Sequence, residues 1–146
     1  MKVYLGSDHA GFKLKEAIKP FLNSLGVDFE DLGAHKLAPN DDYPNYAFKV
    51  AEKTAKNKSF GILFCGSSHG VCIAANKVKG IRAVAVSDVK CAIMTREHNN
   101  ANILCLSGWN ISKNLSEKII KAFLFTMFTN EKRHKRRINL ITKYEK

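Results

Sequence analysis

The sequence predicts an α/β fold: one single-domain, doubly wound, Rossmann-like sheet of five parallel strands, with helices on both faces and a further helix at the C-terminus. Short apolar runs of strand length alternate with longer segments of helical period, which is typical of parallel βαβ units. The 146 residues are about one ordinary domain, long enough to bury a continuous core without disulfides or metals. A content of 45% hydrophobic and 25% charged residues excludes a disordered or fibrous chain.

The five expected strands are short apolar runs that we expect to lie in one sheet. They span residues 2–6, 27–32, 60–65, 82–87 and 102–106. In a doubly wound sheet, ligands bind beyond the carboxyl ends of the strands. Small and polar residues follow four of these ends, at residues 6–9, 65–70, 87–88 and 107–108. The sequence therefore predicts a ligand site at this edge of the sheet.

The expected helices fill the intervals between the strands and continue to the C-terminus. The first has an apolar face over residues 12–25, and Gly26 follows it where a helix-terminating glycine is expected, while Pro20 is expected to kink it. The remaining helices are expected over residues 46–55, 73–75, 89–97, 111–128 and 131–143. A brief break at Thr129 and Asn130 separates the last two.

The charge of the chain is strongly positive and gathers near the C-terminus. The net charge is +11, and residues 111–146 alone contribute +7. Such a tail fits either a polyanion or a local phosphate site. No aromatic residue is interleaved with the basic ones in residues 131–143, which disfavours nucleic acid. We also expect no membrane partner, because the N-terminus turns polar too soon for a signal peptide and no stretch approaches a membrane span, and hence a cytoplasmic protein.

The cysteines and the glycine-containing turns give no sign of a metal or an organic cofactor. The four cysteines contain no pair at the two-residue spacing typical of zinc sites, and Cys72, Cys91 and Cys105 are interpreted as small core residues. The segment CGSSHGV, from Cys65 to Val71, lacks the lysine of a P-loop and the glycine pattern of a dinucleotide site. We therefore predict no metal and no cofactor.

The same segment predicts an anion site, because it joins a strand directly to a helix. Several backbone amides converge at such a junction and favour negative charge. Cys65 closes the strand there, so we expect the amides to lower the pKa of its thiol and allow it to act as a base. Ser67 could donate or accept a proton beside it. The alternatives are a plain tight turn and a cysteine that only packs.

Further polar residues are expected to join Cys65 at the ligand edge. Asp8 and His9 follow the first strand, where two polar side chains are costly unless they bind something. His98 and Asn99 end the fourth helix, and an imidazole there could serve as a general acid, or could simply cap the helix.

The basic tail contains a spacing suited to phosphate. Arg133 and Arg137 are four residues apart and share a helical face, so that their guanidinium groups could grip one phosphate together. A solvated basic face is the alternative interpretation, and it is preferred for Lys132 and Lys135. An apolar stripe on the same helix, with Ile138, Leu140 and Ile141, could pack on a partner or on its own domain.

Five segments of the chain resemble the type B ribose-5-phosphate isomerases, with the galactose-6-phosphate isomerase subunits as a more distant branch. They are GSDHAGF near the start, DYPNYA at 42–47, CGSSHGVCIAANKVKGIRA in the middle, REHNNAN, and RHKRR in the tail. The resemblance covers nearly the whole chain. It implies an enzyme that interconverts D-ribose 5-phosphate and D-ribulose 5-phosphate through a cis-enediolate in the non-oxidative pentose phosphate pathway, without metal or cofactor.

The resemblance also implies a role for each matching residue. Cys65 matches the base, Ser67 its hydroxyl helper and His98 the residue that opens the sugar ring. The residues expected to bind the sugar phosphate are Asp8, His9, Gly66, Ser67, Ser68, His69, Gly70, Asn99, Arg133 and Arg137. Members of the family are homodimers or homotetramers whose sites combine elements of two chains, and residues 131–146 could lie at that interface.

The chain departs from the family pattern at several positions. Val71 stands where one branch has a glutamate base, Ser68 where glycine is usual, and Trp109 where many members have a phosphate-binding arginine. Residues 130–132 replace the usual glycines before the RH pair. Three alternatives stay open: a hexose 6-phosphate isomerase of the same fold acting on allose or galactose 6-phosphate, a non-enzymatic flavodoxin-like binding module, and an RNA-binding tail.

Overall fold

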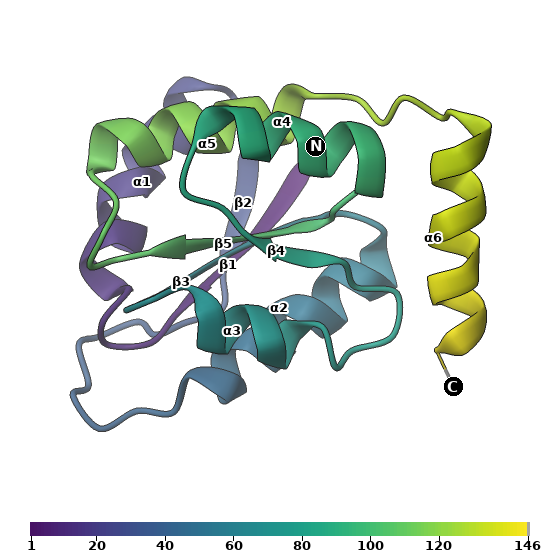
Figure 1. Cartoon of the computed structure of the whole chain (residues 1–146). Coiled ribbons are helices and arrows are strands. Elements are labelled where there is room, and N and C mark those ends of the chain that lie inside the picture. Colours follow the sequence, from purple (N-terminus) through teal and green to yellow (C-terminus); the bar gives the residue numbers. More distant parts are fainter. Residues whose placement is uncertain (146) are drawn as a thin grey trace.

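The computed structural model describes residues 1–145, and its five strands form one parallel sheet (Figure 1). The strands are β1 (Lys2–Ser7), β2 (Asp28–Asp31), β3 (Phe60–Cys65), β4 (Ala83–Ala85) and β5 (Ile103–Ser107). They lie side by side in the order β2-β1-β3-β5-β4. The five predicted strands are confirmed, although β2 and β4 are shorter than expected.

The register brings the ends of the three central strands to one level. Ser7 of β1 pairs with Phe64 of β3, and Cys65 of β3 pairs with Ser107 of β5. The last residues of these strands are buried. The edge predicted to bind a ligand is therefore built by the three best-buried strands of the sheet.

Helices cover both faces of the sheet (Figure 1). One face carries α1 (Phe12–Ser24), α4 (Val89–Asn99) and α5 (Lys113–Phe125), and the other carries α2 (Tyr43–Asn57) and α3 (His69–Ala75). Buried side chains on the first face include Leu14, Ile18, Leu106, Ile119 and Phe123. Those on the second include Ala47, Val50, Leu63, Val71 and Ile103. Both sides of the predicted doubly wound architecture are thus present.

Two details of α1 follow from its sequence. The helix continues through Pro20 for one further turn, to Ser24, although a proline removes one backbone hydrogen bond. Gly26 then adopts a positive φ of 68°, and Val27 donates its amide to the carbonyl of Leu22. The glycine predicted to terminate this helix therefore occupies the left-handed conformation that favours glycine.

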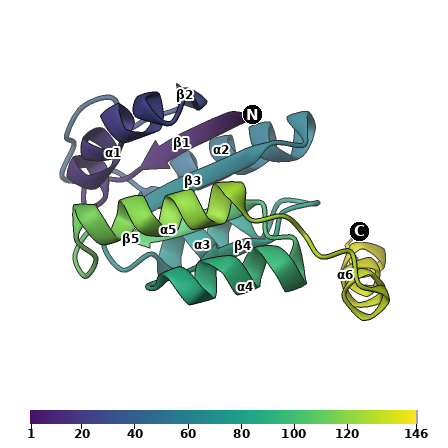
Figure 2. The same ribbon diagram turned by 90° about the horizontal axis from the view of Figure 1, so that it is seen from above.

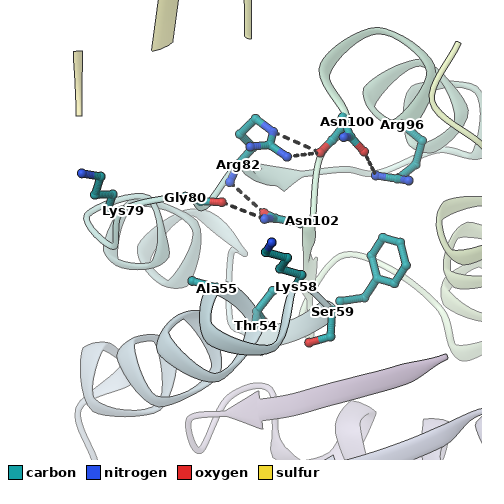
Figure 3. Close-up of a pocket in the computed structure, with 11 residues that line it drawn as sticks. Thr54, Ala55, Lys58, Ser59, Lys79, Gly80, Arg82, Arg96, Asn100 and Asn102 are labelled. Carbon is teal, nitrogen blue, oxygen red and sulfur yellow. Dashed lines mark hydrogen bonds between the residues drawn. The ribbon is translucent and has the colours of Figure 1, made fainter. Parts of the chain in front are cut away.

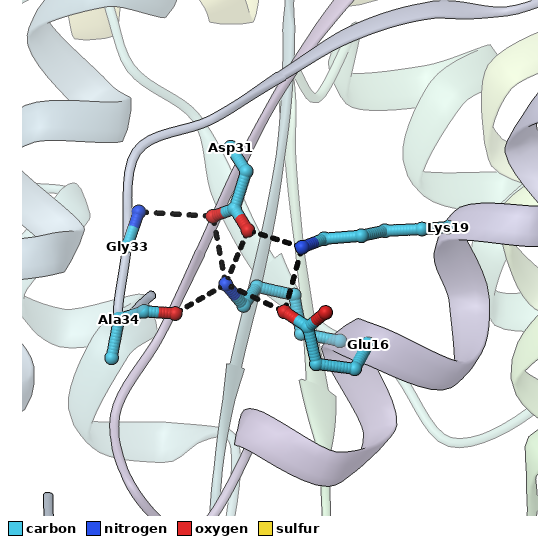
Figure 4. Close-up of polar contacts among 6 residues, drawn as sticks. Glu16, Lys19, Asp31, Gly33 and Ala34 are labelled. Atoms are coloured by element: carbon cyan, nitrogen blue, oxygen red, sulfur yellow. Dashed lines mark hydrogen bonds and ion pairs between the residues drawn. The ribbon is translucent and has the colours of Figure 1, made fainter. Parts of the chain in front are cut away.

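A buried ion pair fastens α1 to β2 (Figure 4). Lys15 is 0% exposed, and its Nζ lies 2.6 Å from Asp31 Oδ2 and 2.6 Å from the carbonyl oxygen of Ala34. Lys19 Nζ lies 2.6 Å from the same carboxylate oxygen, and the amide of Gly33 donates to Asp31 Oδ1 over 2.9 Å. The carboxylate of Asp31, with a longer contact to Glu16 at 3.3 Å, therefore neutralises a lysine that is completely removed from solvent.

The last helix, α6 (Lys132–Tyr144), stands apart from the sheet and its covering helices (Figure 2). It is reached through an extended connection after α5, and it confirms the predicted C-terminal helix. Its residues Leu140 and Ile141 are 62% and 50% exposed. Two residues of the apolar stripe predicted on this helix are thus not covered by their own chain, while Ile138 is half-buried. No helix within residues 1–145 combines the length and the apolar character needed to cross a bilayer.

Candidate active site

The carboxyl ends of the central strands are tied together by hydrogen bonds. The amide of Asp8 donates to the carbonyl of Phe64 over 3.3 Å, which joins the residues that follow β1 to the end of β3. The hydroxyl of Ser107 donates to the carbonyl of Gly66 over 2.5 Å, which joins β5 to the turn after β3. β1 and β3 flank the point where the order of strands reverses, where doubly wound folds bind their ligands.

A cavity of about 200 Å³ opens at this edge beside Cys65. Its lining comes from the turns after β1, β3 and β5 and from the start of α2: Asp8, His9, Ala10, Tyr43, Cys65, Gly66, Ser67, Gly70 and Trp109. Cys65 is only 4% exposed, yet it belongs to this lining, so the cavity reaches this residue. Six of the predicted site residues therefore share one cavity.

Two other predicted residues lie next to it. Ser68 and His69 line a neighbouring cavity of about 260 Å³, and Ser67 lines both. Ser68 has a positive φ of 71° at the start of α3, and its hydroxyl donates to the carbonyl of Ser67. This backbone conformation favours glycine, which agrees with the residue that the resemblance leads one to expect here.

The amides of the turn converge on the sulfur of Cys65, as predicted, but they do not decide its pKa. Burial is the largest influence and raises the pKa of the thiol, and the charge of Asp8 raises it further. The amides of Val71, Ser68 and Ser67 lower it by hydrogen bonding, and the net pKa lies above the ordinary value of 9.0. The predicted lowering of the pKa of Cys65 is therefore wrong, because the strand end is more deeply buried than the sequence indicates.

Two aromatic rings enclose the turn that carries the amides. A Cβ atom at Gly66 would lie 2.5 Å from the ring of Trp109, and one at Gly70 would lie 2.8 Å from the ring of Tyr43. Neither position can therefore accept a side chain while the rings stay in place. Sequence reasoning gave Tyr43 no role, although it belongs to the DYPNYA segment.

Asp41 is a second residue that sequence reasoning missed. Its Oδ1 lies 2.8 Å from Nδ1 of His9 and accepts the backbone amide of the same residue over 3.0 Å. This hydrogen bond raises the pKa of His9, which favours its charged form. Burial raises the pKa of Asp8, although the amide of Gly11 donates to its Oδ1 over 3.0 Å and opposes the shift. The only feature of the sequence that could have indicated a role for Asp41 was the pair of acidic residues at 41 and 42, ahead of α2.

The same three residues are the described group best placed to hold a cation. Asp8, His9 and Asp41 each offer one ligand atom, and these atoms lie within 4.8 Å of one another. Nδ1 of His9 is already hydrogen-bonded to Asp41. A cation would therefore have to be held through the other ring nitrogen or at the expense of this bond.

His98 and Asn99 lie at the opposite edge of the sheet from Cys65. α4 starts after β4 and runs back against the strand direction, so its last residues reach the amino ends of the strands. Arg82, which precedes β4, donates its Nε to the carbonyl of Asn99 over 3.0 Å and thereby fixes this position. Within one chain, His98 and Asn99 therefore do not lie beside Asp8 and Cys65.

The ring of His98 stacks on a residue of the C-terminal helix. Its centroid lies 4.7 Å from that of His134, with an angle of 16° between the rings. Arg133 and Arg137 lie on the same helix and are exposed, and Nε of Arg133 lies 2.8 Å from Oε2 of Glu131. The predicted acid and the predicted phosphate clamp thus form a second group, separated from the thiol cavity by the length of the sheet.

Comparison with known proteins gives a consistent result over nearly the whole chain. The family model described as Ribose/Galactose Isomerase matches residues 3–141. The probable ribose-5-phosphate isomerase B of Mycoplasma genitalium is 45% identical over 146 residues, covering 99% of this chain and 95% of the relative. The ribose-5-phosphate isomerase B of Mycobacterium tuberculosis strain H37Rv is 39% identical over 147 residues, covering 100% and 91%.

Solved structures agree with these relatives. The crystal structure of ribose-5-phosphate isomerase B from Mycoplasma genitalium with bound ribulose-5-phosphate superposes with a TM-score of 0.95 at 44% identity, covering 99% of this chain and 95% of that one. The isomerase B from Clostridium thermocellum gives 0.95 at 40% identity, covering 99% and 97%. On the strength of the matched family model and these relatives, the chain belongs to the ribose/galactose isomerase family.

Proposed function

We propose that this protein is a ribose-5-phosphate isomerase that interconverts D-ribose 5-phosphate and D-ribulose 5-phosphate. The observation that carries the proposal is the cavity at the carboxyl edge of the sheet, where Cys65, Asp8, His9 and Ser67 meet. Relatives covering nearly the whole chain carry this name, and one solved relative holds ribulose-5-phosphate. The reaction belongs to the non-oxidative pentose phosphate pathway, and we place the protein in the cytoplasm.

The chemistry requires one base to move a proton between C1 and C2 of the open-chain sugar. Cys65 takes this role, because it lines the cavity and the chain has Val71, a buried apolar residue, where a branch of the family has a glutamate. Ser67 borders the same cavity and passes the second proton between the oxygen atoms. Every step is a proton transfer, so the mechanism needs neither a metal nor an organic cofactor.

The turn after β3 stabilises the intermediate. Removal of the proton places negative charge on the oxygen of a cis-enediolate, and preorganised amides near that oxygen lower the barrier. The turn over residues 66–70 supplies such amides at the start of α3, and Gly66 and Gly70 line the cavity. Asp8 and His9 line the same cavity and hold the sugar hydroxyls and the phosphate. The hydrogen bond that His9 donates to Asp41 favours the charged form of His9, which suits a phosphate contact.

A second copy of the chain completes the site. His98, Asn99, Arg133 and Arg137 lie too far from Cys65 within one chain to act on the same small sugar. An isologous pairing of two chains places the edge with Cys65 of each against the edge with His98 of the other. His98 and Asn99 then reach the sugar ring, and the arginines of α6 reach the phosphate. We propose a homodimer as the smallest active form, with a homotetramer as the alternative, and the exposed apolar stripe of α6 packing on the partner.

The direct test is an assay of the purified protein for ketose formation. Activity on D-ribose 5-phosphate above that on allose 6-phosphate and galactose 6-phosphate supports the proposal, and the reverse order would identify a hexose phosphate isomerase.

Cys65→Ser should lower kcat by about 10²–10⁴-fold, the usual contribution of an acid–base group. Cys91→Ser is the matched control, because Cys91 is exposed at the start of α4 and should leave the rate unchanged. Absence of turnover on all three sugars would overturn the proposal.

A further inference from the structure

Another cavity, with several cationic residues in its lining, lies at the edge of the sheet opposite the thiol (Figure 3). Its volume is about 380 Å³, which falls within the range of small-molecule sites. The lining comes from the end of α2, the segment before β4, the end of α4 and the starts of β3 and β5: Thr54, Ala55, Lys58, Ser59, Phe60, Lys79, Gly80, Arg82, Arg96, Asn100 and Asn102. None of these residues takes part in the proposed reaction.

The charge of this lining is entirely positive. It contains four cationic residues, Lys58, Lys79, Arg82 and Arg96, and no aspartate or glutamate. None of the four forms an ion pair within the described part of the chain. The nearest carboxylate that influences them is Glu145, which attracts Arg82 and accepts the amide of Gly80 over 3.1 Å. One carboxylate at the margin leaves most of this positive charge without compensation.

Two of these cations are fixed in place rather than free in solvent. Arg82 donates Nη2 to the carbonyl of Asn100 over 2.8 Å, and Arg96 donates Nη1 to the side-chain oxygen of Asn100 over 2.8 Å. Burial is the main cause that lowers the pKa of both arginines, and the charge of Arg82 lowers that of Arg96 further. Carbonyl groups at the end of a helix carry only partial negative charge. Buried charges in proteins are ordinarily paired with a full opposite charge, which these arginines lack within the described residues.

Unsatisfied hydroxyl groups lie in the same wall. Thr54 Oγ1 and Ser59 Oγ are buried and have no hydrogen-bond partner among residues 1–145. Both residues line the cavity. Buried polar groups without partners are uncommon in folded proteins, and two in one wall indicate a missing acceptor.

We infer that this cavity is a binding site for a small phosphorylated molecule, with a lining that shares no residue with the thiol cavity. Two fixed guanidinium groups and two flexible ammonium groups match the charge and the several oxygens of a phosphate ester or a diphosphate. The volume leaves room for a group beyond the phosphate, which would contact Phe60 and Asn102. The inference concerns binding alone and does not depend on the proposed reaction.

Titration calorimetry of the full-length protein with inorganic pyrophosphate tests this site. The double substitution Lys58→Gln with Lys79→Gln removes two lining cations whose side chains are exposed, so the fold should persist. We expect it to weaken pyrophosphate binding by about tenfold or more, since two charge contacts are lost. Lys56→Gln with Lys77→Gln is the matched control, because both lysines are exposed nearby but lie outside the lining, and it should change the affinity less than about twofold.

Repeating the titration with Arg137→Ala distinguishes pyrophosphate bound in this cavity from pyrophosphate bound by the arginines of α6. Persistence of the lysine-dependent binding in this background supports a separate site. Loss of all binding with Arg137→Ala alone would place the pyrophosphate in the isomerase site and overturn the inference. Absence of binding at millimolar pyrophosphate would also overturn it, as expected if an acidic side chain of a second copy fills the cavity. Equal affinities of the two double variants for pyrophosphate would overturn it too.

Discussion

The reactivity of Cys65 depends on the balance between burial and the amides around its sulfur. The amides of Ser67, Ser68 and Val71 stabilise the thiolate, but desolvation at the end of β3 and the charge of Asp8 oppose them and prevail. The free protein therefore holds a protonated thiol at neutral pH. The raised pKa lowers the fraction of the protein that has the thiolate at neutral pH. A thiolate with a raised pKa is, however, a stronger base.

We predict that alkylation of Cys65 in the free protein accelerates with pH beyond pH 9. Only the thiolate reacts, so its rate with iodoacetamide should rise about tenfold per pH unit until the pKa is passed. Cys72 serves as the internal control, because a hydrogen bond with Cys105 lowers its pKa and its rate should level off earlier. Peptide mass spectrometry separates the two sites. A rate for Cys65 that levels off below pH 8 would contradict the raised pKa.

Trp109 is predicted to set the length of sugar that the cavity accepts. Its ring lies over Gly66 and forms part of the cavity wall, yet the residue is 71% exposed. Trp109→Ala should therefore remove the wall at little cost in stability, within about 0.5 kcal/mol. We expect the preference for ribose 5-phosphate over allose 6-phosphate, measured as the ratio of kcat/KM values, to fall by up to about tenfold. Trp109→Phe keeps a ring and should keep most of the preference. An unchanged ratio with alanine would show that the indole does not limit the substrate.

At the scale of residues, the sequence predicts which chemical groups form the thiol cavity better than it predicts their environment. Asp8, His9, Cys65 and Ser67 follow strand ends, so their position at one edge is a consequence of a parallel sheet. The sign of the pKa shift of Cys65 depends on how deeply the strand end is buried. Asp41 reaches His9 through a loop whose path the sequence does not encode in any periodic pattern.

At the scale of elements, the contact between α1 and β2 depends on a single carboxylate (Figure 4). Burial alone would raise the pKa of Asp31, but hydrogen bonds from Lys15, Lys19 and the amide of Gly33 outweigh it, and the net pKa is lowered. A carboxyl group whose pKa is lower in the folded state stabilises the fold above the pKa of the unfolded chain. This stabilisation is lost as the pH falls below about 3.8 and through the folded value.

We predict that Asp31→Asn lowers the free energy of unfolding by about 3 kcal/mol at pH 7, because it leaves the buried charge of Lys15 with only the longer, partly exposed contact to Glu16, at 3.3 Å. Denaturant unfolding of the two proteins measures the difference, which should shrink as the pH falls below about 4. Glu30→Gln is the matched control on the same strand, since its contacts with Lys2 and Lys53, at 3.4 and 3.8 Å, are exposed and worth at most about 1 kcal/mol. Equal effects of the two substitutions would contradict the role given to the buried pair.

The elements themselves could be predicted because their signals are local. Apolar runs gave the positions of the five strands, and Gly26 gave the end of α1. The bounds of β2 and β4 were less certain, because strands at the edges of a sheet have one neighbour and pair over fewer residues. The position of His98 within the chain follows from topology instead: a helix between parallel strands ends at the amino edge, opposite to the strand ends that carry Cys65.

At the scale of the whole molecule, the groups proposed for catalysis lie at two opposite edges of the sheet. α6 stands beside the edge that carries His98 (Figure 2). The thiol cavity has Cys65 and His9, but its lining includes neither His98 nor any arginine. The other edge has His98 against His134 and the arginines of α6, with no thiol base beside them. Two copies related by a twofold axis supply both halves twice, so that an active dimer has two identical sites.

This arrangement predicts that two inactive variants restore activity when their subunits are mixed. Cys65→Ser inactivates one half of a site and His98→Asn the other, so a mixed dimer has one site with both substitutions and one with neither. The variants are co-expressed with different tags, and the doubly tagged dimer is purified and assayed. One of its two sites is intact, so it should show about half of the wild-type activity per dimer.

A mixture in which both substitutions fall in the same half provides the control for that experiment. Dimers that combine Cys65→Ser with Asp8→Asn contain no unaltered site, because each chain contributes a damaged half beside the thiol. They should stay at the level of the separate variants, since subunit exchange alone creates no activity. Recovery in this control as well would mean that the variants are merely stabilised by mixing. The topology keeps Cys65 and His98 at opposite edges of one chain, so they can act on one sugar only from different chains. Absence of recovery with Cys65→Ser and His98→Asn would therefore mean that the two residues do not act on the same sugar.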